Sequence, residues 1–323
     1  MQTRHYLHAL ILPSLLGAAT AADAQLDPQL AQRYFDEATA LCERDAGRLW
    51  GVSLCGPMVI FDPATGARAT SLPEPEGQPP RFGGYADGPV TWGGMRWFAY
   101  PVTMLPANDA DGRQQLLLHG LFHRIQPELG LTPSDGANEH LDTFDGRVWM
   151  QLEWRALLAA VESSGSDRAE AIADALAFRH ERRRRFPGAA DNERRDEIRE
   201  GLATYTGIAA WADSPADARR AAASALAGAG SMPSFVGQFE AASGPAYGVL
   251  LDDLLPGWRR QVRSTSDLGD LLASAVSRPP TTDVARAEAR YNAATLRAGR
   301  RSAIGRSRFA SQRCVSASSM GQS

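Results

Sequence analysis

Residues Gln115–Gln126 read QLLLHGLFHRIQ and place two histidines, His119 and His123, four positions apart within an apolar run. An α-helix advances by about 100° per residue, so side chains four positions apart lie on the same face. Both imidazoles should therefore point in one direction. Two neutral imidazoles side by side supply half of the ligands that a zinc ion needs. The stretch predicts a helix that presents half of a metal site.

The residue after the first histidine departs from the usual zinc-peptidase motif. In His-Glu-x-x-His the Glu serves as the general base, whereas this chain has Gly120. Glycine cannot accept a proton, and no Asp or Glu lies one helical turn away. Because glycine inside a helix costs about 1 kcal/mol relative to alanine, we expect the helix to tolerate Gly120→Glu. That substitution should also restore a base.

A third ligand has two candidates, Glu153 in QLEWRAL and Glu200 in EIREGLATY. Each lies in a stretch with helical periodicity. A glutamate on an amphipathic helix often only faces solvent, and this reading applies to both.

The segment Glu197–Gly207, EIREGLATYTG, resembles the glutamate helix of aminopeptidase-type gluzincins, roughly Asn-Glu-Gly-x-Ala-x-Tyr, with Arg199 in place of the Asn. Over residues 40–255 the order of motifs is similar to that of exported bacterial proteins with a zincin-like core. The resemblance implies a zincin (gluzincin) metallopeptidase-like protein that holds one zinc ion. It assigns His119, His123 and Glu200 as ligands, with Glu153 in reserve as a ligand or as an acceptor that orients a histidine.

A second departure concerns the tyrosine that gluzincins place three residues before a glycine to stabilise the transition state. The similar stretch here is Ala241-Ala242-Ser243-Gly244, so Ala241 holds that place. Tyr247, three residues beyond the glycine, is the alternative that could approach the metal.

Three functions remain open on these residues. The leading one is an exported zinc metallopeptidase-like protein that is weakly active or inactive (a pseudoenzyme) and has a peptide or protein as ligand. The second is an active zinc hydrolase whose base comes from elsewhere, such as Glu139 or Glu197. The third is a helical binding or scaffold protein whose histidines are core residues.

The first 24 residues predict a secretory signal peptide, with an apolar stretch from Tyr6 to Ala19 and a small-x-small cleavage site at Ala22–Ala24. No later segment reaches 18 apolar residues, so we expect no membrane insertion after cleavage and a periplasmic or secreted protein. The net charge of −3 indicates no nucleic-acid partner. In an oxidising compartment, Cys42 and Cys55 should form a disulfide, although two buried free thiols are the alternative.

The 323 residues are 44% hydrophobic, which is enough for a sizeable core. Periodicity predicts a mainly helical α+β fold with a small N-terminal sheet, and the resemblance implies that the helical domain is zincin-like. The expected regions are a signal peptide (1–24), a helix and small sheet (25–110), a helical metal-site region (111–278) and a helix with a disordered or truncated tail (279–323). Arg182–Arg185 should be an exposed helix end. Asn138, His140 and Asp142 lie in a polar connector and could line the cleft.

Overall fold

The computed structural model describes residues 26–82, 87–276 and 278–301 and shows a mainly helical α+β fold with one small sheet. The expected mainly helical α+β class with a small N-terminal sheet is therefore confirmed. The predicted signal peptide, Cys314 and most of the expected tail lie outside the described residues. Within the described ranges, no helix has the length and apolarity needed to cross a membrane.

The N-terminal part contains one long helix and a four-stranded sheet of order β2-β1-β4-β3. Its elements are α1 (Pro28–Asp45), β1 (Met58–Phe61), β2 (Arg68–Thr70), β3 (Gly88–Trp92) and β4 (Met95–Pro101). Helix α1 begins where the Asp27 carboxylate accepts a hydrogen bond from the Gln29 amide, with proline at its first position. Strands β3 and β4 form a hairpin, while β1 and β4 run parallel.

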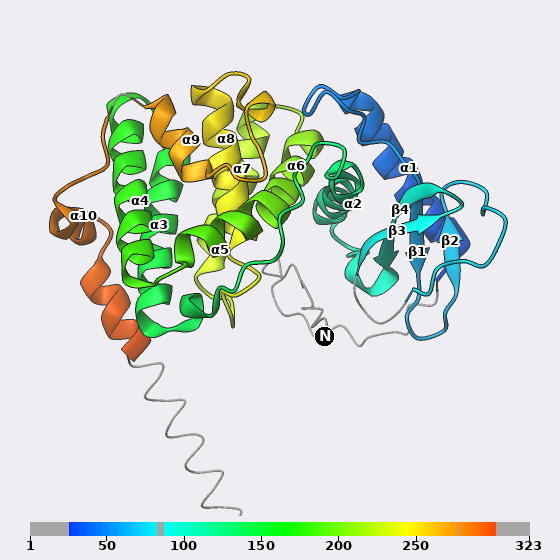
Figure 1. The fold of residues 1–323 in the computed structure, drawn as a ribbon, viewed down its shortest axis with the longest axis horizontal. Helices are drawn as coiled ribbons and strands as arrows, with labels where there is room; N and C mark the ends of the chain where they lie inside the picture. Colours follow the sequence, from blue (N-terminus) through cyan, green and yellow to red (C-terminus); the bar gives the residue numbers. More distant parts are fainter. Residues whose placement is uncertain (1–25, 83–86, 277, 302–323) are drawn as a thin grey trace, which may run out of the picture.

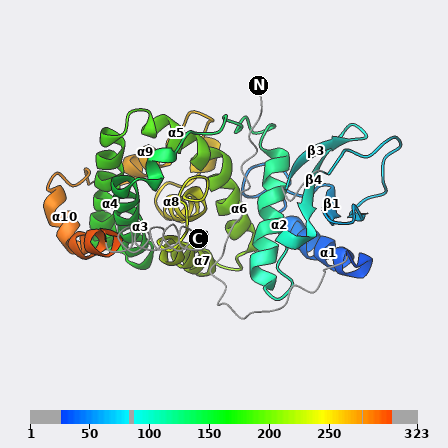
Figure 2. The same ribbon diagram turned by 90° about the horizontal axis from the view of Figure 1, so that it is seen from below.

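Helix α2 (Ala110–Ile125) carries both histidines, and Asp109 caps its start by accepting from the Gly112 amide. It lies between the sheet with α1 on one side and the helical part on the other (Figure 1, Figure 2). Its residues contact β4 and α1 on the first side and α6 (Leu202–Trp211) on the second. Because both sides of α2 are covered, most of its apolar residues are buried.

The remaining elements pack as a helical bundle (Figure 1). They are η2 (Glu139–Asp142), α3 (Phe144–Glu162), α4 (Gly165–Arg185), α5 (Ala189–Asp196), η3 (Glu197–Gly201), α7 (Pro215–Ala229), α8 (Glu240–Leu254), η4 (Trp258–Arg260), α9 (Leu268–Ala275) and α10 (Val284–Arg290). The short turn η1 (Val102–Met104) instead follows β4 and precedes α2 in the chain. Most match the periodic stretches of the sequence. Helix α8 contains Pro245 in its interior, although proline is more usual at the first position of a helix.

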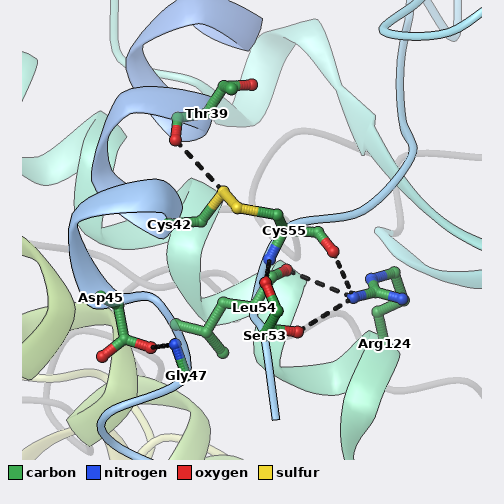
Figure 3. Close-up of a disulfide and its surroundings, with 8 residues drawn as sticks. All are labelled: Thr39, Cys42, Asp45, Gly47, Ser53, Leu54, Cys55 and Arg124. Atoms are coloured by element: carbon green, nitrogen blue, oxygen red, sulfur yellow. Dashed lines mark hydrogen bonds between the residues drawn. A yellow bond between two sulfur atoms is a disulfide. The ribbon is translucent and has the colours of Figure 1, made fainter.

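A disulfide joins Cys42 at the end of α1 to Cys55, as the sequence predicts (Figure 3). The loop that it closes is also held by α2, because the Arg124 guanidinium donates to the carbonyls of Ser53, Leu54 and Cys55. Arg124 follows His123 directly, so the disulfide loop braces the helix turn that carries the second histidine.

Replacing both Cys42 and Cys55 by serine should destabilise the protein by about 3 kcal/mol, the chain-entropy value for a loop of this size. Denaturant unfolding of the oxidised wild type and the double variant would measure the difference. The reduced wild type is the matched control and should unfold like the variant. Equal stability of all three proteins would show that the disulfide contributes nothing.

Candidate metal site

The two histidines of α2 face each other, as their spacing predicts. Their Nε2 atoms are 2.9 Å apart and their ring centroids 4.7 Å apart. The His119 side chain is buried, and that of His123 is only slightly exposed. The Phe98 ring from β4 stacks on His123 with an interplanar angle of 10° and fixes the orientation of that imidazole.

Glu200 brings the third side chain from the neighbouring helix. Its Oε2 lies 3.3 Å from His123 Nε2 and 3.6 Å from His119 Nε2. It belongs to the single π-helical turn η3, a feature frequent at functional sites. Helices α2 and α6 approach closely where α6 has Gly207, because a Cβ there would lie 2.4 Å from the Gln115 carbonyl oxygen. This close approach and the π turn together place Glu200 beside the histidines.

Further polar groups fix the ligand atoms. His123 Nδ1 lies 2.6 Å from Gln126 Oε1, while the amide nitrogen of Gln126 donates to the Arg199 carbonyl at 2.7 Å. This arrangement assigns the proton of His123 to Nδ1 and leaves Nε2 as the acceptor that a metal requires. The Thr204 hydroxyl lies 3.3 Å from His119 Nδ1 on the other side. Arg199 donates to Glu200 Oε1, so Oε2 alone faces the histidines.

The charges of the site suit cation binding. Burial alone would raise the pKa of Glu200, but His123, His119 and Arg199 hold that pKa well below its usual value. Burial lowers the pKa of His119 and favours its neutral form. Burial would also lower the pKa of His123, yet Glu200 and Gln126 raise it overall. An ionised carboxylate beside a neutral imidazole is the form in which both groups bind a metal.

The spacing of the three atoms agrees with one tetrahedral ion. Bonds of 2.0–2.1 Å at tetrahedral angles would place neighbouring ligand atoms about 3.3 Å apart. The observed separations of 2.9, 3.3 and 3.6 Å bracket that value. Among the described residues, His119, His123 and Glu200 are the group whose ligand atoms all lie within 4.8 Å of one another. These residues therefore could hold a metal ion.

The space beside Gly120, where the side chain of the usual glutamate would begin, is occupied by other side chains. A Cβ on Gly120 would lie 2.5 Å from the Tyr100 hydroxyl and 2.6 Å from two atoms of the Phe98 ring. Both rings are buried, and the Tyr100 hydroxyl donates to the Leu117 carbonyl. Helix propensity alone does not oppose Gly120→Glu, but the packing of β4 on α2 does, because the added side chain would meet Phe98 and Tyr100.

The reserve ligand Glu153 lies in a different cluster. Its carboxylate accepts from Arg182, Arg179 and the Tyr247 hydroxyl, the last at 2.7 Å. Tyr247 is fully buried, and the Arg179 guanidinium lies over its ring. Glu153 is not part of the His119–His123–Glu200 group, and the Tyr247 hydroxyl is directed at Glu153. The structure thus places both side chains among buried ionic groups, and it places Glu200 rather than the reserve ligand Glu153 beside the histidines.

Three arginines and four acidic residues around Glu153 form a connected set of ion pairs, which we call the buried ionic network. Its members are Glu153, Arg179, Arg182, Arg183, Glu193, Glu197 and Asp267. The prediction that Arg182–Arg185 form an exposed helix end is wrong for Arg182, whose side chain is fully buried. Glu197, considered as a base, is paired with Arg179 through both oxygens. Glu139, the other proposed base, is exposed on η2.

The connector residues also have structural partners. His140 Nε2 lies 2.9 Å from Glu193 Oε1, and the Asn138 amide donates to Asp196 at 2.8 Å. Asp142 accepts from Arg147 and from the Phe235 amide. Ala241, at the place of the transition-state tyrosine, lies in the first turn of α8. These contacts tie η2 to the helices around it.

One acidic residue near the site has no signal in the sequence. Asp87 lies in a loop rich in Pro and Gly, yet its carboxylate interacts electrostatically with His119, His123 and Glu200. Burial raises the pKa of Asp87, the two histidines lower it, and Glu200 raises it again. Its position beside α2 follows from the pairing of β3 with β4, which a local sequence pattern does not reveal.

Comparison with protein-family models, with curated proteins and with solved structures finds no match for this chain. The gluzincin resemblance is therefore carried by the motifs alone. The geometry of the three side chains is the independent observation beside it.

Proposed function

We propose that this protein binds one zinc ion through His119, His123 and Glu200 and is a metallopeptidase-like protein without the usual catalytic glutamate. The convergence of the three ligand atoms carries this proposal. Two histidines and one glutamate leave one tetrahedral position open, as in catalytic rather than structural zinc sites. When bound, zinc would supply a Lewis acid that polarises a carbonyl oxygen.

The protein's own residues limit this chemistry. Gly120 provides no proton acceptor, and Phe98 with Tyr100 occupies the space where the glutamate would lie. A general base contributes roughly 10²–10⁴-fold to such a reaction, so hydrolysis of peptides should be weak unless a residue outside α2 replaces the glutamate. The reading as a scaffold with core histidines leaves unexplained why two Nε2 atoms and a carboxylate oxygen converge.

We also propose that the protein acts outside the cytoplasm. The Cys42–Cys55 disulfide supports an oxidising compartment, where such bonds form and persist. This agrees with the signal peptide predicted for the first 24 residues.

The purified protein should contain about one zinc per chain after mild dialysis, because two neutral imidazoles and a carboxylate form three of the four ligands. Elemental analysis measures the stoichiometry. His119→Ala should reduce it to near zero, whereas His180→Ala, which removes an exposed histidine of α4, should leave it unchanged. A wild-type stoichiometry near zero in zinc-containing buffer would contradict the site.

A further inference from the structure

The filled space at Gly120 means that any proton acceptor must reach the site from outside α2. Such a group has to lie near the open ligand position without being a ligand itself. Glu200 is unsuited to this role because its two oxygens face Arg199 and the histidine pair. The sheet, whose strand β4 packs on α2, offers the nearest other elements.

Asp87 meets this geometric requirement. It immediately precedes β3, whose first residue Gly88 pairs with Ala99 of β4. Continuing the antiparallel register by one residue places Asp87 opposite Tyr100, whose hydroxyl lies against Gly120. Strand β3 also contacts α2 directly. The backbone thus brings Asp87 to the side of α2 where the missing glutamate would have acted.

The charges around Asp87 point the same way. Its carboxylate interacts electrostatically with both histidines and with Glu200, and its charge helps to raise the pKa of the Tyr100 hydroxyl. Asp87 is nevertheless not a member of the group of ligand atoms within 4.8 Å of one another. Such a carboxylate is close enough to interact with all three ligands but is not a ligand itself. It is therefore suited to accept a proton from a water molecule at the open ligand position.

We propose that Asp87 is the proton acceptor of this site and replaces the glutamate that Gly120 lacks. The inference rests on the proposed function. Asp87 takes one proton from a water molecule, whose oxygen forms a bond to the carbonyl carbon of a peptide. The C–N bond then breaks, and the proton held by Asp87 passes to the leaving amine. The first products are a carboxylic acid and an amine, and transfer of the acid proton to the amine gives a carboxylate and an ammonium group, with no other reactant.

The test compares Asp87→Asn and Asp87→Glu with Asp36→Asn, a matched control that removes an equal charge from an exposed residue of α1. Zinc affinity is measured by competition with a chromogenic chelator, and hydrolysis with a quenched fluorescent peptide library. Asp87→Asn should keep one zinc per chain, bind it about 10-fold more weakly, and hydrolyse peptides at least about 10²-fold more slowly. Asp87→Glu should retain part of the rate, and Asp36→Asn should match the wild type.

The outcomes separate this inference from the proposed function. Zinc binding with no wild-type hydrolysis would overturn the role of Asp87 and leave the metal site intact. So would an unchanged rate or an unchanged zinc affinity in Asp87→Asn. A wild type that binds no zinc would instead refute the metal site on which both depend.

Discussion

Glu153→Ala should destabilise the protein by about 3–5 kcal/mol, the usual cost of removing one partner from a buried ion pair. The carboxylate is fully buried and accepts from Arg179, Arg182 and Tyr247. Its loss leaves two buried guanidinium groups with one acceptor fewer and the Tyr247 hydroxyl without its acceptor. Denaturant unfolding of metal-free protein measures the change. Glu153→Gln keeps the volume and one oxygen acceptor, so its stability should lie between that of Glu153→Ala and that of the wild type.

Glu200→Ala is the matched substitution at the glutamate of the metal group, and it should affect zinc binding more than stability. It should lose zinc severely, while metal-free stability falls much less than in Glu153→Ala, because Glu200 is bonded to the partly exposed Arg199. Folded Glu153→Ala should still bind zinc. Zinc loss in Glu153→Ala with retention in Glu200→Ala would show that the ligand assignment is reversed.

Local rules account for most of the fold. Helical periodicity and capping residues such as Asp27 and Asp109 predict the helices closely, since both signals are local in sequence. The start of α8 has no such signal, because Pro245 lies inside the helix although proline is usual at the first helical position. The charge of Arg182 predicted an exposed side chain. Arg182 can be buried together with Arg179 and Arg183 because four carboxylates from other elements pair with these arginines.

The site was predictable only where its residues share one helix or one motif. The spacing of His119 and His123 determines their common face, and the EGLAxY pattern indicated Glu200. Asp87 depends on the β3–β4 pairing and on how that hairpin meets α2, which no local pattern encodes. The spacing of residues also gave no sign that Phe98 and Tyr100 fill the space beside Gly120.

Gly120→Glu should therefore destabilise the protein and should not raise peptide hydrolysis. The new Cβ would overlap the Tyr100 hydroxyl and the Phe98 ring, and the carboxylate would be buried between them. Overpacking costs about 1–3 kcal/mol, and burying an unpartnered charged group adds to it, so we expect a loss of about 3 kcal/mol or more. Denaturant unfolding and the peptide assay, both with one equivalent of zinc, measure the two effects.

Gly120→Ala is the steric control, because it adds only the Cβ. Helix propensity alone predicts a gain of about 1 kcal/mol for this change. The contacts at 2.5 and 2.6 Å predict a net loss instead, since Phe98 is fixed between His123 and Tyr100. Adding Phe98→Ala should recover part of the loss, so the double variant should be more stable than the sum of the two single effects allows. A Gly120→Ala variant more stable than the wild type would show that β4 yields at this contact, and the glutamate position would then be open.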